Sequence, residues 1–565
     1  MSVPLPLWQN GDGVSVPPHA SDRVAGNLRR WATASWAAFG LLTVDGRSDS
    51  GQARAEPETD LRRIAGRLAR PALLGLLSTM AITYGASQFG SPFSLKVTGA
   101  WFFGVPSITT PPGRNVLVSL VCSYGGMLLL IRAWLDMLRT VSPSRSDQRP
   151  LPVAALAAVA ALWVLPLLIG PPLFSQDVYS YAAQGAMVTQ GINPYHHGPD
   201  ALGVANAYYP YVDQLWGASP APYGPVFMIL DAGIVTLTGH HVLATVEGLR
   251  LLSLAGVILL GIFLPMLARS MGRDGGTVFT LAVLNPVVLL HLIAGAHNDA
   301  LMLGLLVAGL AMAQRRRPVV GIVLCALAAM VKAPAAIGLV YIGWNWVGAG
   351  VPWRHRIRPL TTAGVIGAGV AAVVTAVTGL GWDWVKALDN PSVVRSVLDP
   401  VTALGMILGS ITHLMHLPFG VSMMLHLTRT LGLLGALVAC AWLLFNSDRI
   451  GVIKAIGLSL LVVVVLGPVV QPWYLAWGVV LLAPIGFGRW RPILVATTLV
   501  GSFIGFPGGY LLVQELARAS LWSVALALAV LLAIPIPPLV TRIRAILAER
   551  QAVLAQLRPQ ALLAD

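Results

Sequence analysis

The chain has 565 residues, of which 56% are hydrophobic and 11% are charged, and its formal net charge is +14. A soluble protein of this size has too little interior to bury so much apolar surface, so the composition excludes a soluble globular protein. The basic residues stand in short clusters at the ends of apolar runs, which indicates cytoplasmic anchors of a membrane protein and no nucleic-acid partner.

Residues 1–70 are rich in Gly, Pro, Ser, Asp and Arg and show no sustained hydrophobic period. The apolar run Trp31–Val44 is too short to span a membrane comfortably. We expect residues 1–70 to form a disordered cytoplasmic tail and residues 542–565 to form a second one. No cleavable signal-peptide pattern is present, so the first span is expected to act as the targeting signal.

Residues 71–541 are predicted to form an all-α polytopic membrane domain of about 13–15 transmembrane helices, because apolar runs of helical length recur along them. With the Arg clusters placed inside, the charges favour about fourteen crossings. Residues 225–237 lie between two segments that the charges place outside, which predicts a re-entrant or half-buried helix. The predicted spans are 71–89, 115–137, 151–173, 243–268, 276–295, 299–314, 318–331, 334–349, 360–380, 422–446, 451–469, 473–488, 491–511 and 520–541.

A polar, aromatic loop, residues 175–224, follows the third span. Residues 151–249 contain no Lys or Arg, so the positive-inside rule places this outer loop on the extracytoplasmic face. Asp177 begins the helix-compatible segment 178–190 at the membrane–water boundary and is the first candidate for chemistry on a lipid-borne substrate. The alternative is that Asp177 only caps that helix. Asp200 and Asp213 are alternative acids, each expected to be a solvated loop residue.

Aromatic and hydrogen-bonding residues accompany Asp177 in the outer loop, and such residues bind sugars by stacking and polar contacts. The candidates are Tyr179, Tyr181, Tyr195, His196 and His197. The adjacent histidines lack a suitably spaced third ligand, so no metal site is expected. Tyr223 ends the loop, either as part of a turn or as a lining residue of the pocket.

Polar residues also break the later apolar runs near the outer face, which suggests a cavity that opens outward. His297, Asn298 and Asp299 form either a functional site or the N-cap of a helix that begins at Ala300. Lys332 needs an anionic partner or water, and a phosphate group or snorkelling to the interface would meet this need.

Arg395, in the outer loop 381–400, is a second candidate for binding phosphate. Gln471, Trp473 and Tyr474 form either an interfacial aromatic belt or a platform for a sugar ring. The three cysteines, Cys122, Cys325 and Cys440, lie inside apolar stretches and offer neither a disulfide framework nor a metal-ligand pattern.

Several short motifs, taken in order, resemble those of the polyprenol-phosphomannose-dependent α-1,6-mannosyltransferases of actinobacteria. The resemblance covers about residues 70–540. The motifs are Gln176-Asp177-Val178-Tyr179-Ser180-Tyr181, Asn193-Pro194-Tyr195, Tyr223-Gly224-Pro225, Leu284-Asn285-Pro286, His297-Asn298-Asp299-Ala300-Leu301, Lys332 and Gln471-Pro472-Trp473-Tyr474.

The resemblance implies a GT-C-like helical bundle with an extracytoplasmic catalytic loop in the plasma membrane. It implies a polyprenyl phosphomannose donor and a lipid-anchored mannan acceptor, in synthesis of the lipomannan and lipoarabinomannan backbone. Many GT-C enzymes carry a pair of acids in the first large outer loop. This chain has Gln176 beside Asp177, which argues against a two-carboxylate or metal-dependent mechanism.

Conversion of a β-linked lipid phosphomannose into an α-mannoside requires inversion at the anomeric carbon. One base must take the proton of the acceptor hydroxyl, and Asp177 suits this role. The departing phosphate needs a cation rather than an acid, which we assign to Lys332 with Arg395 as the second candidate. No nucleotide, metal or other cofactor is required, and membrane lipids surround the enzyme.

Two other functions remain open from the sequence. A lipid-linked sugar transporter or flippase would also need an outward cavity, but it should show polar breaks on both sides of the midplane, whereas here they gather on one face. A GT-C transferase that uses lipid-phosphate arabinose or glucose would carry the same types of residue.

Overall fold

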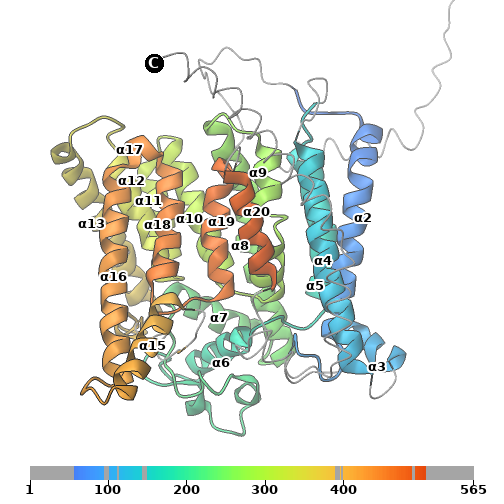
Figure 1. The fold of residues 1–565 in the computed structure, drawn as a ribbon, viewed down its shortest axis with the longest axis horizontal. Coiled ribbons are helices and arrows are strands. Elements are labelled where there is room, and N and C mark those ends of the chain that lie inside the picture. Colours follow the sequence, from blue (N-terminus) through green and yellow to red (C-terminus); the bar gives the residue numbers. More distant parts are fainter. Residues whose placement is uncertain are drawn as a thin grey trace, which may run out of the picture. The chain divides into compact units, whose positions relative to one another are not determined.

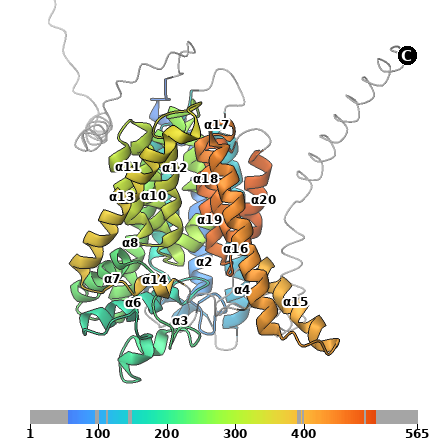
Figure 2. The same ribbon diagram turned by 90° about the vertical axis from the view of Figure 1, so that its left-hand side faces the viewer.

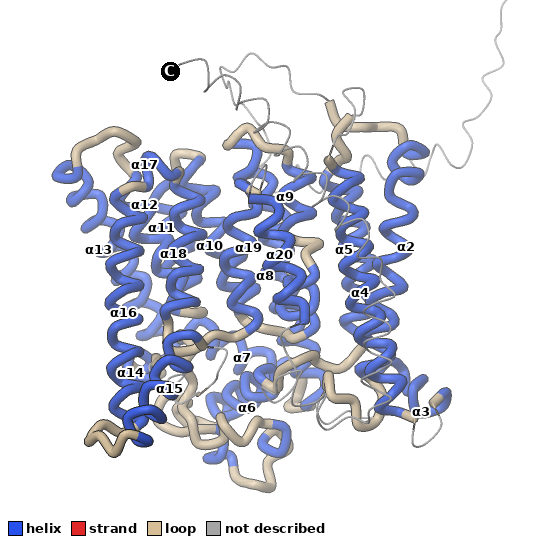
Figure 3. The backbone as a smooth tube through the Cα atoms, in the orientation of Figure 1, coloured by secondary structure: helices blue, strands red, loops and turns tan. Residues whose placement is uncertain are grey.

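The computed structural model describes residues 56–94, 101–110, 114–142, 149–388, 395, 399–486 and 490–503. All regular elements in these ranges are helices (Figures 1 and 3). Residues 1–56 form one unit and residues 57–565 another, and the described helices belong to the second. The predicted span 520–541 and the tail 542–565 lie outside the described residues.

Three long helices form one side of the bundle: α2 (Leu61–Ala86), α4 (Asn115–Val141) and α5 (Val153–Leu168). The short elements η1 (Trp101–Gly104) and α3 (Val105–Thr109) precede α4. Asp60 caps α2 by accepting a hydrogen bond from the N–H of Arg62. The first helix thus begins inside the segment predicted as a tail, because this cap starts it ten residues before the predicted boundary.

The outer-loop region folds into α6 (Asp177–Thr189), η2 (Pro199–Leu202), η3 (Tyr209–Tyr211) and α7 (Pro225–Leu237). The helix predicted over residues 225–237 therefore has the predicted bounds. Proline at the first position of α7 fixes φ at a helical value. It lacks the backbone N–H that would have no intrahelical partner at this position, which explains the sharp start of the helix.

The middle of the chain supplies the helices between residues 242 and 378. Its elements are α8 (Val242–Ser270), α9 (Gly275–Ala282), the π-helix η4 (Val288–Ala294), α10 (Asp299–Gln314), α11 (Pro318–Ala329), η5 (Ala333–Ala336), α12 (Ile337–Asn345) and α13 (Trp353–Thr378). The axes of η4 and α10 differ in direction by 112° across a break of four residues. This bend brings the start of α10 to the site described below.

The last part of the chain forms α14 (Trp384–Ala387), α15 (Pro400–Leu414), α16 (Val421–Phe445), α17 (Ser447–Ile450), α18 (Val452–Leu466), η7 (Pro472–Tyr474), α19 (Leu475–Leu482), η8 (Ala483–Ile485) and α20 (Trp490–Phe503). Figure 2 shows α13 and α16 on different sides of the bundle. No span was predicted over α15, because its apolar run is shorter than a crossing requires.

The chain is an all-α polytopic membrane protein. Within the described residues four helices are long and apolar enough to cross a membrane, namely α4, α8, α13 and α16, and the bent pair η4 and α10 makes a fifth if it counts as one span. Shorter apolar helices, among them α5, α11 and α18, coincide with predicted spans. The larger number of crossings stays a prediction.

The two ends of the bundle differ in composition. In Figure 1, α6, α7 and α15 lie at the lower end, whereas α9 and α17 lie at the upper end. The upper end also holds the start of α2, with Arg62 and Arg63 in its first turn, and the end of α4, with Arg139 in its last turn. Basic residues therefore gather at the end opposite α6 and α7.

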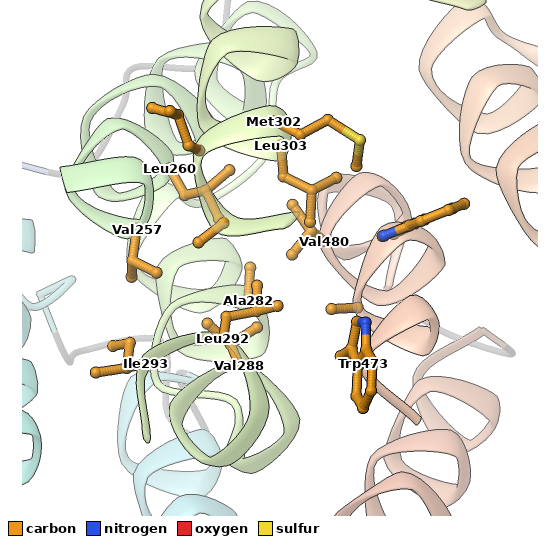
Figure 4. Close-up of a cluster of buried hydrophobic side chains, with 14 of the residues drawn as sticks. Val257, Leu260, Ala282, Val288, Leu292, Ile293, Met302, Leu303, Trp473 and Val480 are labelled. Atoms are coloured by element: carbon orange, nitrogen blue, oxygen red, sulfur yellow. The ribbon is translucent and has the colours of Figure 1, made fainter. Parts of the chain in front are cut away.

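The interior between these ends is filled by close-packed apolar side chains. Figure 4 shows part of this core, with Val288 and Leu292 of η4 on one side and Trp473 and Val480 on the other. All four are buried. Packing of this density fixes the segments that carry polar groups at the lower end.

Candidate active site

A cavity of about 290 Å³ lies where α6, the segment after α11 and the segment before α19 meet. One side is polar and aromatic, and the other is an apolar wall from α16, α18 and neighbouring residues. The polar and aromatic lining is Asp177, Ser180, Gln184, Trp216, Ser219, Tyr223, Lys332, Gln471, Trp473, Tyr474 and Trp477. The wall includes Leu388, Leu433, Ala436, Val463, Val464 and Val469.

Asp177 is the first residue of α6, and its side chain makes no capping bond to that helix. Gln176 occupies the capping position, and the N–H of Asp177 donates to Ser175 Oγ at 3.0 Å. The alternative that Asp177 serves as a helix cap is therefore wrong. Burial raises the pKa of Asp177 to about 6, and the positive charge of Lys332 opposes this rise. A carboxyl group with such a pKa accepts a proton readily near neutral pH.

His297 lies beside Asp177 at the bend between η4 and α10. Its Nδ1 is 3.6 Å from Asp177 Oδ2, which is too long for a hydrogen bond but close enough for one ligand group to contact both. The ring is fully buried and stacks on Trp473, with ring centroids 3.7 Å apart. Ser253 Oγ of α8 donates to the carbonyl oxygen of His297 at 3.2 Å, which fixes the bend.

Both segments that carry this pair contain a non-glycine residue in the left-handed region. Phe174, three residues before Asp177, has a φ of 64°, and Ala296, directly before His297, has a φ of 56°. Such a conformation costs about 1–3 kcal/mol and persists only where the surrounding structure holds it. The packing of the bundle therefore supports the positions of both residues.

Lys332 pairs with Asp299 rather than reaching the interface. Its Nζ donates to Asp299 Oδ2 at 2.7 Å, and Trp477 Nε1 donates to Asp299 Oδ1 at 2.6 Å. The ammonium group also lies 4.6 Å from the centre of the Tyr474 ring, so an aromatic face and a carboxylate hold it. Snorkelling, the alternative given for Lys332, is wrong because the side chain is buried.

Asn298 occupies the capping position of α10, and Asp299 is the first residue of that helix. Asn298 stands before α10 but its side chain makes no capping bond. Its Oδ1 and Nδ2 are buried and have no hydrogen-bond partner among the described residues. Asp299 is fully buried and accepts its bonds from Lys332 and Trp477. The motif therefore holds the capping position of α10 without a side-chain capping bond, and its polar side chains serve other contacts.

Several predicted sugar-binding residues lie away from the cavity lining. Tyr179 stacks on Tyr211, while Tyr181 packs edge-on against Tyr223 and Phe227. The hydroxyl group of Tyr195 is buried without a partner among the described residues. Of these tyrosines, Tyr181 directly supports the lining residue Tyr223.

His196 and His197 also lie apart from the described lining. His196 Nε2 is 2.8 Å from Asp383 Oδ2, and its side chain is half-exposed. Hydrogen bonds with His196 and Lys386 lower the pKa of Asp383. Arg395 is exposed and is not among the residues that line the cavity. The structure thus joins Asp177, Tyr223, His297, Asp299, Lys332, Gln471, Trp473 and Tyr474, with Asn298 beside them.

Sequence reasoning missed five of the polar and aromatic lining residues, namely Ser180, Gln184, Trp216, Ser219 and Trp477. Ser180 and Gln184 follow Asp177 at the helical spacings of three and seven residues, and this period could have identified them. No local pattern marks Trp216 or Trp477. Within the described part of the chain, no group of three or more His, Cys, Asp or Glu side chains could hold a metal ion.

Comparison with known proteins gives two family matches. Residues 72–348 match the model described as "Alpha-(1->6)-mannopyranosyltransferase, N-terminal domain", and residues 401–534 match "MptB C-terminal domain". Together these ranges hold almost all of the lining residues of the cavity.

Similar curated proteins come from mycobacteria and corynebacteria. A probable alpha-(1->6)-mannopyranosyltransferase of Mycolicibacterium smegmatis is 33% identical over 490 residues, which are 80% of this chain and 85% of that protein. Alpha-(1->6)-mannopyranosyltransferase A of Mycobacterium tuberculosis is 32% identical, over 74% of this chain and 81% of that protein. Alpha-(1->6)-mannopyranosyltransferase B of Corynebacterium glutamicum is 30% identical, over 88% of this chain and 85% of that protein. No solved structure matches.

Proposed function

Because the chain belongs to the alpha-(1->6)-mannopyranosyltransferase family and is therefore an α-1,6-mannosyltransferase, we propose that its donor is polyprenyl phosphomannose. The acceptor is a lipid-anchored mannan, the growing backbone of lipomannan and lipoarabinomannan. The reaction inverts the anomeric carbon, and the cavity faces the extracytoplasmic side of the plasma membrane.

The observation that carries the proposal is that one cavity holds a carboxylate, an ammonium group and an apolar wall. Asp177 is the only acidic residue among the described residues that line it, and Lys332 is the only basic one. A sugar held by a phosphate on a prenyl chain needs this combination. A nucleotide-linked donor would have no use for the apolar wall.

Asp177 is the general base of this proposal. Its carboxylate takes the proton of the acceptor 6-hydroxyl as that oxygen attacks the anomeric carbon of mannose. The bond from that carbon to the phosphate oxygen breaks on the opposite face, through an oxocarbenium-like state. One attack from the face opposite the leaving group converts a β-linked donor into an α-linked product.

Lys332 stabilises the departing phosphate. An ammonium group has three N–H donors, and one of them is used by Asp299. The others suit phosphate oxygens, whose negative charge grows as the glycosidic bond breaks. The aromatic faces of Tyr474 and Trp477 keep water from the ammonium group and so strengthen this interaction.

The prenyl chain lies along the apolar wall from α16 and α18. Leu433 and Ala436 of α16 face the cavity, while Leu434 and Leu437 of the same helix are more than half exposed on an apolar surface. A lipid tail can therefore pass from the wall to the membrane without crossing a polar layer. Arg395 has no role in this proposal.

The proposal is tested with membranes that contain the enzyme, a polyprenyl phosphomannose donor and a short α-1,6-mannoside acceptor. We expect mannose transfer with the wild-type chain and none with Asp177→Asn. Asp200→Asn is the matched control because Asp200 is an exposed acid of the same loop. Lack of transfer by the wild type, or transfer only from lipid-phosphate arabinose or glucose, would overturn the donor assignment. An anomeric configuration that is retained in the product would overturn the mechanism.

A further inference from the structure

One face of α6 carries a line of polar side chains that begins at the proposed base. Asp177, Ser180 and Gln184 are spaced by three and four residues, so they lie above one another on the same side of the helix. All three line the cavity. At 1.5 Å per residue the line runs about 10 Å along α6 from Asp177.

The two residues beyond Asp177 each carry a buried polar atom that no described residue satisfies. Ser180 is 4% exposed and Gln184 is 3% exposed. Ser180 Oγ and Gln184 Oε1 have no hydrogen-bond partner among the described residues. A buried polar atom in this condition costs about 1–3 kcal/mol unless a ligand supplies the missing bond. Two such atoms on one cavity wall are therefore suited to the hydroxyl groups of a bound molecule.

The helix that carries this line is fixed in rotation. A Cβ atom on Gly185 would lie 2.7 Å from the backbone carbonyl carbon of Asp231, so α6 and α7 touch through their backbones. This contact fixes the rotation of α6 about its axis and so keeps Ser180 and Gln184 on the side that lines the cavity. The packing of α6 against α7 therefore determines the orientation of these two residues toward the cavity.

Trp216 contributes a flat surface to the same cavity. It comes from the outer loop, together with the lining residues Ser219 and Pro220. An indole ring offers the apolar face on which sugar rings stack, and the hydroxyl-binding groups of α6 supply the polar contacts that fix their orientation. This combination is suited to a pyranose ring.

We infer that Ser180, Gln184 and Trp216 form the subsite for the acceptor mannoside and set the preference for it. The inference rests on the proposed function, which assigns Lys332 and the apolar wall to the donor. The attacking hydroxyl must lie at Asp177, and the rest of the acceptor sugar then extends along α6. Ser180 and Gln184 bind its other hydroxyl groups, so that the acceptor is held with its 6-hydroxyl at the base.

The inference is tested by steady-state kinetics with a short synthetic α-1,6-mannoside in detergent. Gln184→Leu keeps the side-chain size and removes the amide. We expect its KM for the acceptor to rise about tenfold, the equivalent of one hydrogen bond, while the KM for the donor stays within about twofold. Gln190→Leu is the matched control, because Gln190 ends the same helix and is exposed.

A second variant pair covers the case in which Gln184→Leu does not fold. Ser180→Ala should raise the KM for the acceptor several-fold, and Ser180→Thr, which keeps the hydroxyl group, should restore most of the affinity. An unchanged acceptor KM in both Gln184→Leu and Ser180→Ala would overturn the inference, as would a rise in the donor KM instead. A wild-type enzyme that transfers no mannose would refute the proposed function itself, which the wild-type measurement shows separately.

Discussion

The ionisation of Asp177 should set the acid limit of the reaction. Burial raises the pKa of this carboxyl group from 3.8 to about 6 against the opposing charge of Lys332. A base must be deprotonated to act, so Asp177 is about 90% active at pH 7 and about 10% active at pH 5. A solvated aspartate would still be more than about 90% ionised at pH 5. We therefore expect kcat/KM to fall about tenfold for each pH unit below pH 6.

The assay follows initial rates of mannose transfer from pH 4.5 to pH 8 at low concentrations of both substrates. The proposed donor is a phosphodiester, whose acidic proton is lost far below this range, so it does not obscure the acid limb. Lys332→Met should react far more slowly because the departing phosphate loses its cation. It also removes the charge that lowers the pKa of Asp177, so the acid limb of its residual activity should move to higher pH. An acid limb of the kcat/KM profile near pH 4 in the wild type would refute this assignment of the limb to Asp177. An acid limb at the same pH in Lys332→Met as in the wild type would also refute it.

Three further changes test the framework around the site. Asp299→Asn should destabilise the enzyme by about 3–5 kcal/mol, seen as a lower thermal midpoint in detergent, because Lys332 loses its buried partner. The double variant with Lys332→Met should be more stable than Asp299→Asn alone, and equal midpoints would contradict the pairing. Gly224→Ala should lower the midpoint or prevent folding, because its Cβ would lie 2.0 Å from the backbone oxygen of Met330. Gly233→Ala, with open space around that position inside α7, should raise the midpoint slightly. Arg250→Met should also destabilise the enzyme, by about 1–3 kcal/mol, because carbonyl oxygens at the end of α5 and just after it lose the shared donor Arg250 Nη1. An unchanged thermal midpoint would contradict that role.

The helices could be predicted well from the sequence where a start signal coincided with an apolar run. Proline at position 225 marks the start of α7, and residues 299–314 have the predicted bounds of α10. The predicted start of α2 is too late because the first turns of this helix are rich in arginine, which hides their helical period. α15 was missed because fifteen residues do not reach the length of a span.

The site was predictable as a set of residue types but not as a set of contacts. Asp177, Lys332 and Trp473 stood out because polar or aromatic groups interrupt apolar runs. The pairing of Asp299 with Lys332, and with Trp477 at a distance of 178 residues, depends on how distant helices pack, which no local pattern encodes. The role of capping residue was assigned to Asp177 as an alternative because the exact first residue of a helix depends on tertiary contacts.

The cavity is built from two kinds of segment with different freedom to change. The bend that carries His297 and Asp299 is enclosed by the core, whereas Trp216 comes from a surface loop. A change in the core disturbs the whole bundle, but the loop can accept insertions and substitutions at little cost. With the inferred role of Trp216 in acceptor binding, exchange of this loop between relatives should change the preferred acceptor while leaving Asp177 and Lys332 in place.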